Sequence, residues 1–201
     1  MTTTASPPAP SVLSPWLTMW RAPRKTMLHL MNTEERPSWI PVVALSGINQ
    51  ALWWLVGNDA SSARNAGSLV GFALFFGVVQ LIYGVLISPF LIALLGGWFG
   101  GEGDAADLRH GIAWSFVPQA FVLILWVPLL AAFGWRTFDS TRQVETLLQG
   151  LALLCLIPLA VAPVWTFVLQ VGAVATAMRL PVWKALITLV ILALPALLLP
   201  R

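Results

Sequence analysis

The stretch LLGGWFGGEGDAADLRHG, residues 94–111, ends one long charge-free apolar interval and opens the next. Charged side chains are costly to place in hydrocarbon, so intervals without them mark candidate membrane spans. Along the whole chain, charges delimit five such intervals: 37–58, 65–101, 111–135, 146–178 and 185–200. The pattern predicts an all-α, polytopic membrane protein.

The composition supports this class of protein. Of the 201 residues, 58% are hydrophobic and 9% are charged, whereas a soluble domain carries about 25% charged residues. The eleven basic residues are scattered between apolar blocks rather than gathered in a stripe, so we expect no nucleic acid partner. The first 38 residues contain no continuous apolar core, so we expect no signal peptide.

The interval lengths predict a five-helix transmembrane bundle. A hydrocarbon core of about 30 Å needs about 20 helical residues. The second and fourth intervals are longer than that, but a turn buried in lipid would leave backbone groups unpaired, so each is predicted as one long helix. Prolines at 89 and at 158 or 163 are candidate kinks. The predicted spans are about 39–57, 67–98, 112–134, 147–178 and 182–199, which together form a domain over residues 39–200.

Five spans place the two termini on opposite faces of the membrane. Seven basic residues fall on the N-terminal side: Arg21, Arg24, Lys25, Arg36, Arg109, Arg179 and Lys184. Four fall on the other: Arg64, Arg136, Arg142 and Arg201. The positive-inside rule therefore predicts a cytoplasmic N-terminus and an outside C-terminus. The parts of the two long helices that exceed the membrane thickness would then extend into the cytoplasm. The amino-acid composition fits a protein of a bacterial inner membrane.

The segment before the first span has two predicted parts. Residues 1–15 begin with small, polar and proline-rich residues and are expected to form a disordered tail. Residues 16–38 interleave aromatic, apolar and basic side chains, as interfacial amphipathic helices do. Two compatible interpretations are anchoring to anionic lipid and packing on the cytoplasmic face of the protein itself. The candidate interface anchors are Trp16, Trp20, Arg21, Arg24 and Lys25.

The glycine-rich stretch at 94–111 does not match a phosphate-binding loop. A dinucleotide fingerprint from Gly101 and Gly103 would need glycine at Ala106, and no lysine follows any glycine as a Walker motif requires. Glycines at spacing four serve close helix packing, so we favour packing or a helix-to-loop transition over a ligand loop. The candidate cytoplasmic interaction loop comprises Gly96, Gly97, Gly100, Gly101, Glu102, Asp104, Asp107, Arg109 and His110.

Nothing in the sequence assembles a catalytic or metal site. Side chains of the types used in acid–base or nucleophilic catalysis occur close together, namely Asp107, Arg109, His110 and Ser115. The sequence around them has no nucleophile elbow, so they are better explained as solvated polar groups. The single cysteine, Cys155, can form neither an internal disulfide nor a cysteine-based zinc site. We therefore expect no enzyme, no metal and no cofactor.

The predicted spans contain no charged residue in their interiors, which argues against an ion-coupled transporter. Neutral polar residues remain, and three glutamines, Gln80, Gln119 and Gln170, could converge inside the bundle. They are candidate intramembrane polar positions. They would either form hydrogen bonds between helices or line a polar path for a neutral solute or a lipid head group.

The order of several motifs resembles the Yip-one domain family of Ypt/Rab-interacting membrane proteins, in its bacterial form. The motifs are R-x-P-R-K-T-M at 21–27, L-G-G-W-F-G-G at 95–101, G-I-A-W-S-F-V-P at 111–118, V-W-T-F-V-L-Q-V-G-A-V at 164–174 and L-P-V-W-K-A-L at 180–186. The resemblance implies a five-span helical bundle with a cytoplasmic N-terminus and no catalytic residues. Eukaryotic members have a glycine–tyrosine pair where this chain has Gly111-Ile112, and their Rab-linked role is not carried over.

These observations lead to two functional hypotheses. The first is a non-enzymatic adaptor or scaffold that recruits a protein partner, or a second copy of itself, at the cytoplasmic face. The alternative is a lipid-handling or small-solute transport protein that uses the neutral polar positions. Membrane lipids are expected partners under both hypotheses.

Overall fold

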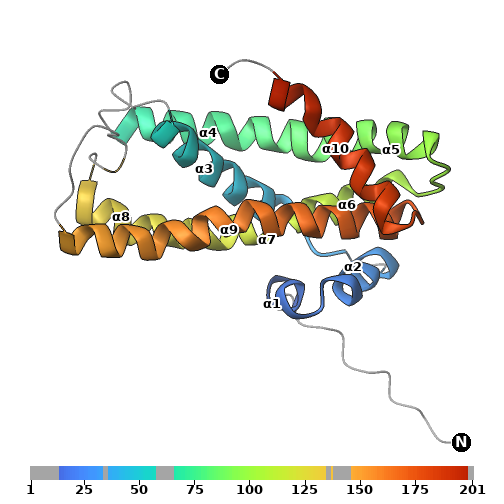
Figure 1. Ribbon diagram of the computed structural model, residues 1–201, viewed down its shortest axis with the longest axis horizontal. Coiled ribbons are helices and arrows are strands. Elements are labelled where there is room, and N and C mark those ends of the chain that lie inside the picture. The colour runs from blue at the N-terminus through green and yellow to red at the C-terminus, as the bar shows by residue number, and fades with distance from the viewer. Residues whose placement is uncertain (1–13, 34–35, 58–65, 135–136, 138–145, 199–201) are drawn as a thin grey trace, which may run out of the picture.

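The computed structural model describes residues 14–33, 36–57, 66–134, 137 and 146–198, and these are almost entirely helical, with no strand among them (Figure 1). This confirms the predicted all-α class. Most of the predicted tail, residues 1–13, lies outside the described residues, and the first helix begins at Ser14. The helices are α1 (Ser14–Arg21), α2 (Pro23–Asn32), α3 (Ile40–Gly57), α4 (Ala66–Leu81), η1 (Ile82–Ile87), α5 (Ser88–Trp98), α6 (Ala105–Ser115), α7 (Val117–Val122), η2 (Leu123–Leu125), α8 (Trp126–Phe133), α9 (Thr146–Ala177) and α10 (Val182–Leu198).

Within the described parts of the chain, three continuous helical segments are long and apolar enough to cross a membrane: Gly67–Trp98, Ala105–Ala132 and Leu154–Ala177. They run along the length of the bundle, whereas α3 and α10 cross it obliquely (Figure 1). The apolar parts of these two helices, Ile40–Val56 and Val182–Leu194, are shorter. The structure therefore shows three helices of spanning length and two shorter apolar ones, and the five-span arrangement stays a prediction.

The helix from α4 to α5 contains one π-helical turn, η1. Pro89 follows this turn and has no N–H to donate to the carbonyl four residues earlier, while its ring would collide with that carbonyl. The wider π turn accommodates the ring: the Ser88 N–H donates to the Tyr83 oxygen, five residues back. The predicted kink site at Pro89 is thus a local widening within one continuous helix.

The third apolar segment begins earlier than the predicted start at residue 112. The Asp104 side chain accepts a hydrogen bond of 3.2 Å from the Ala106 N–H, which caps the first turn of α6. Residues 105–111 are therefore helical rather than part of a loop, and only 99–104 connect α5 to α6. Charged residues at 107 and 109 are compatible with a helix, because Asp and Arg have ordinary helix propensities. Their charges oppose burial in hydrocarbon and do not oppose the helical conformation.

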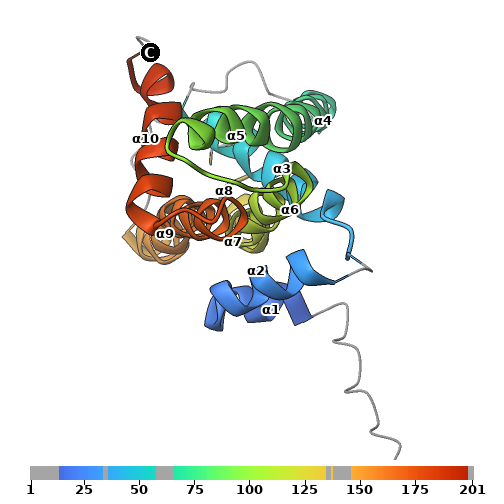
Figure 2. The same ribbon diagram turned by 90° about the vertical axis from the view of Figure 1, so that its right-hand side faces the viewer.

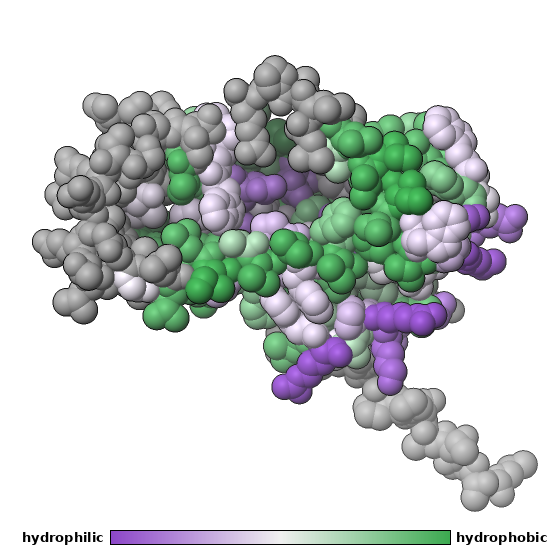
Figure 3. All heavy atoms as spheres, viewed as in Figure 1, coloured by the Kyte–Doolittle hydropathy of each residue, from purple (hydrophilic) through white to green (hydrophobic). Residues whose placement is uncertain are grey.

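The helices bury apolar side chains in three clusters among the described residues and leave other apolar side chains on the outside. Trp114 is 1% exposed and belongs to the largest of these clusters. On the outer surfaces, Leu74 and Phe90 of the α4–α5 helix and Ile124 of η2 are each more than 60% exposed. Figure 3 shows such hydrophobic side chains covering much of the bundle. A surface of this kind matches a lipid environment, because monomeric soluble proteins rarely expose large contiguous apolar areas.

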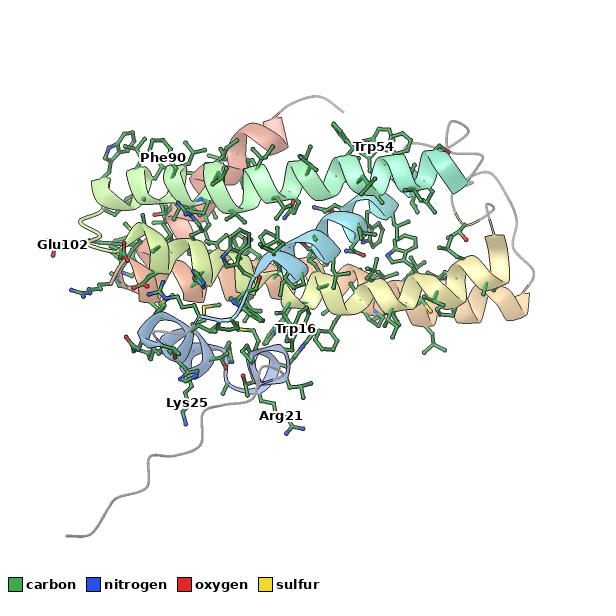
Figure 4. All side chains as sticks on the ribbon, turned by 180° about the vertical axis from the view of Figure 1, so that it is seen from behind. Trp16, Arg21, Lys25, Trp54, Phe90 and Glu102 are labelled. Carbon is green, nitrogen blue, oxygen red and sulfur yellow. The ribbon has the colours of Figure 1, made fainter. Side chains whose placement is uncertain are left out.

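The two N-terminal helices pack across one side of the bundle, beside α6 and α9 (Figures 1 and 2). Met19, Met27 and Leu30 are buried there, and Trp16 meets Trp114 edge-to-face with ring centroids 5.8 Å apart. The Arg21 and Lys25 side chains point away from the bundle (Figure 4). Packing on the protein's own surface is therefore what the structure shows, while anchoring to anionic lipid stays a prediction.

Helices α3 and α4 approach each other closely at Gly47. A Cβ atom added to Gly47 would lie 2.6 Å from the Gly77 Cα and 2.9 Å from the Phe76 oxygen. Only glycine at position 47 permits this contact, which lets the two backbones approach as small residues do in membrane helices. A Cβ added at Gly71 of α4, by contrast, would meet nothing within 4 Å.

Candidate functional site

The C-terminal end of α5 is closed by a Schellman motif. The Gly101 N–H donates to the Gly96 oxygen at 2.9 Å, and the Gly100 N–H donates to the Gly97 oxygen at 3.0 Å. Gly100 has φ of +81°, the left-handed conformation that this motif requires and that glycine adopts without strain. The glycines therefore end the helix, as the predicted helix-to-loop transition requires.

The same turn is attached to the connection between α9 and α10. The Glu102 N–H donates to the Met178 oxygen at 3.1 Å, and the Lys184 ammonium donates to the Phe99 oxygen at 2.8 Å. Gly103 lies so close to α9 that an added Cβ would be 2.2 Å from the Ala177 oxygen. The turn therefore has little freedom to move relative to α9.

Helix α9 ends in the same way. The Leu180 N–H donates to the Ala175 oxygen at 3.0 Å, and the residue between them in the left-handed conformation is Arg179, with φ of +53°. Two capped helix ends thus lie side by side at the right-hand end of the bundle in Figure 1, and Glu102 lies at this end in Figure 4. We call residues 96–104, 109 and 178–181 the capped end.

The structure separates the nine predicted loop residues into groups. Gly96 and Gly101 pack against the Met178 side chain, whereas an added Cβ at Gly97 or Gly100 would meet nothing within 4 Å. Among the charged members of the set, Glu102, Asp104 and Arg109 are exposed. The two remaining members, Asp107 and His110, are partly buried within helix α6. The predicted loop is therefore two helix ends and a short turn, of which only part is accessible.

Asp107 has a structural partner. Its carboxylate lies 2.7 Å from the Arg36 guanidinium, which also donates to the Met31 oxygen at 3.0 Å. Both charged side chains are about one quarter exposed. This ion pair joins the chain after α2 to α6, so Asp107 positions the N-terminal helices rather than forming part of the accessible surface.

An open cavity of about 220 Å³, which we call the polar cavity, lies among the helices of the bundle. Gln80 and Gln170 both line it, so the structure brings two of the three predicted glutamines together. The other polar residues that line it are Gln50, Tyr83 and Ser88. Figure 3 shows hydrophilic side chains in a hollow between the upper and lower helices. The π-helical turn η1 forms part of the wall, a feature that is frequent at functional sites.

Gln119 does not join this cavity, which corrects the expectation that all three glutamines converge. It is 6% exposed and accepts a hydrogen bond from the Asn49 side-chain amide of α3. The Asn49 oxygen in turn accepts from the Trp126 indole N–H at 2.9 Å. Buried polar groups need such partners, so this network fastens α3 to α7 and α8. Gln119 therefore has the structural role that the sequence left open.

The long apolar helices and the exposed apolar surface of the bundle define an integral membrane protein. A family model, the Yip1 domain, matches residues 17–200, so the chain belongs to the Yip1 domain family. This confirms the predicted family, which is not a known enzyme family. No curated protein and no solved structure matches the chain.

Proposed function

We propose that this protein is a non-enzymatic membrane scaffold that binds a protein partner, or a second copy of itself, through the capped end. The main observation in support is that exposed charged side chains belong to a backbone segment that is already ordered before a partner binds. Glu102 and Arg109 are exposed, and the turn that carries Glu102 is bonded to Met178 and Lys184. Binding to a preformed surface costs little ordering entropy, which favours affinity.

The charge distribution supports a cytoplasmic location for this surface. Arg109 and Arg179 belong to the capped end, and Lys184 is bonded to it through the Phe99 oxygen. The positive-inside rule assigns such an end to the cytoplasm. With mixed acidic and basic groups, the capped end is suited to a protein surface of complementary charge.

Photo-crosslinking in native membranes tests the scaffold proposal. A photoreactive amino acid at position 97, where the structure has open space, should form a discrete protein adduct. The double variant Glu102→Arg/Arg109→Glu leaves the net charge unchanged and should reduce that adduct at least about fivefold, because each charge would face a like charge on the partner.

The matched control places the same photoreactive amino acid at Leu74, which is exposed on the apolar surface of α4. That position should yield lipid adducts and no protein adduct that depends on Glu102 or Arg109. A position-97 adduct that persists in the charge-exchanged variant would contradict the proposal, as would the absence of any protein adduct.

The polar cavity favours a second candidate function, the handling of a small neutral solute or a lipid head group. A volume of about 220 Å³ exceeds the roughly 30 Å³ that one water occupies in the liquid. Five polar side chains from α3, the continuous α4–α5 helix and α9 line it, namely Gln50, Gln80, Tyr83, Ser88 and Gln170. Such side chains exchange hydrogen bonds with a polar guest without the cost of burying a charge.

Under this second function, Gln80→Leu/Gln170→Leu should lower lipid flipping or solute uptake in proteoliposomes at least about tenfold, because the guest would lose hydrogen-bond partners. Tyr83→Phe, which removes one hydroxyl from the same cavity, should have a smaller effect. Protein-free vesicles set the background. Transport above background that is equal in wild type and the double variant would exclude the cavity from the mechanism.

A further inference from the structure

A second and larger groove lies between helix α2 and the connected helices α9 and α10. Its volume is about 610 Å³, and we call it the α2–α9 groove. Met27 and Leu28 contribute apolar side chains from α2, and Val168 and Leu169 contribute them from α9. It is separate from the polar cavity, because the two share no lining residue.

Two arginines are the charged residues that line the groove. Arg24 belongs to α2 and Arg179 to the turn after α9, and both are exposed. Neither makes an ion pair within the described part of the chain, where the acidic residues are Glu102, Asp104 and Asp107, none of which lines the groove. A guanidinium presents a planar set of donors that suits phosphate oxygens. The site therefore combines an apolar body with recognition of an anion.

The apolar wall of the groove continues along α9 toward the rest of the bundle surface. Val161, Val164, Val168 and Gly172 follow helical spacing on one face, and all four are exposed. An added Cβ at Gly172 would meet nothing within 4 Å, so this position leaves room in the groove. A hydrocarbon chain lying on this face would pass from the groove to the exposed apolar surface without meeting a charged residue.

The backbone at Arg179 carries a cost that glycine would avoid. Its φ of +53° lies in the left-handed region, where a residue with a Cβ is disfavoured. Glycine occupies the equivalent position after α5, at Gly100. A side chain kept at a strained position indicates that the side chain itself is used. At Arg179 that side chain lines the groove.

From these observations we propose that the α2–α9 groove binds one anionic phospholipid. Its phosphate contacts Arg24 and Arg179, and one acyl chain lies along Val168 and Gly172. The two arginines come from different elements, so the bound lipid connects the N-terminal helices to the bundle. The groove shares Arg179, Leu180 and Pro181 with the capped end, whereas Glu102 and Arg109, whose charges the crosslinking experiment exchanges, do not line it.

Native mass spectrometry of the full chain in detergent tests this site, with phosphatidylglycerol as the probe and phosphatidylcholine as the zwitterionic comparison. Wild type should retain phosphatidylglycerol preferentially. Arg24→Gln/Arg179→Gln should weaken retention about tenfold or more, because charge-assisted hydrogen bonds to the phosphate are lost. The control Arg21→Gln/Lys25→Gln removes the same charge from residues that do not line the groove, and should change retention less than twofold.

A third variant, Gly172→Leu, fills the groove without changing charge and should also weaken retention of phosphatidylglycerol. Its helical circular dichroism should match wild type, because the added side chain enters open space. Equal losses in the two charge variants would overturn the proposal in favour of nonspecific attraction. Equal retention of the two lipids, or unchanged retention in Gly172→Leu, would overturn it as well, as would glycerol phosphate binding as tightly as the complete lipid.

Discussion

Gly47→Ala is expected to destabilise the protein by about 1–3 kcal/mol, the usual range for overpacking a close contact. The added methyl carbon would lie 2.6 Å from the Gly77 Cα and 2.9 Å from the Phe76 carbonyl oxygen. Both are backbone atoms, so neither can move aside as the end of a flexible side chain could. The free energy of unfolding, measured by SDS titration of the purified protein, would report the loss.

The opposite member of the same contact is the control. A Cβ added at Gly77 meets nothing within 4 Å, because it points away from α3. Gly77→Ala should therefore be neutral or slightly stabilising, since alanine is favoured over glycine inside a helix by roughly 0.5–1 kcal/mol. Equal destabilisation by the two substitutions would show that the α3–α4 contact is not where the structure places it.

Asn49→Leu should destabilise the protein by about 1–3 kcal/mol through loss of a polar network. Asn49 is fully buried, and its side chain bonds to both Gln119 and Trp126. Leucine has a similar volume but can neither donate to the glutamine oxygen nor accept from the indole N–H. The midpoint of thermal unfolding, followed by circular dichroism in detergent, should fall.

The neighbouring substitution Gln50→Leu separates this effect from a general loss of polarity in α3. Gln50 is exposed and lines the polar cavity instead of joining the buried network. Its replacement should leave the unfolding midpoint close to that of wild type. If Gln50→Leu lowered the midpoint as much as Asn49→Leu, the network would have no special role in joining α3 to α7 and α8.

The helical class could be read from charge spacing because burying a charge in hydrocarbon is costly wherever the chain folds. The same rule explains why residues 66–98 form one helix: no polar turn interrupts them, and Pro89 causes only a local π turn. The rule was less useful at residues 105–111. Charges mark the limits of hydrocarbon, whereas a helix begins where its cap lies, here at Asp104.

The sequence pattern of the glycine-rich stretch predicts some of its properties but not its tertiary contacts. Its failure to match a phosphate loop could be established residue by residue, and so could its suitability for ending a helix. Some of these glycines contact other residues and some face open space. That difference depends on Met178 and Ala177, about 75 residues further along the chain. Lys184 could be identified as a topology signal, but its bond to the Phe99 oxygen required the two turns to be brought together.

For the three glutamines as well, the sequence predicts the need for a hydrogen-bond partner but not which partner is found. Apolar surroundings alone predict that Gln80, Gln119 and Gln170 need partners, because an unpaired polar group is costly in a membrane. Which partner each one finds depends on how α3 crosses the bundle, and that crossing is set by Gly47 against Gly77. Whether a segment is stable in hydrocarbon depends on its own residues, so the composition of the segment predicts it. The polar cavity and the α2–α9 groove arise from distant segments, so only their packing against one another could create them.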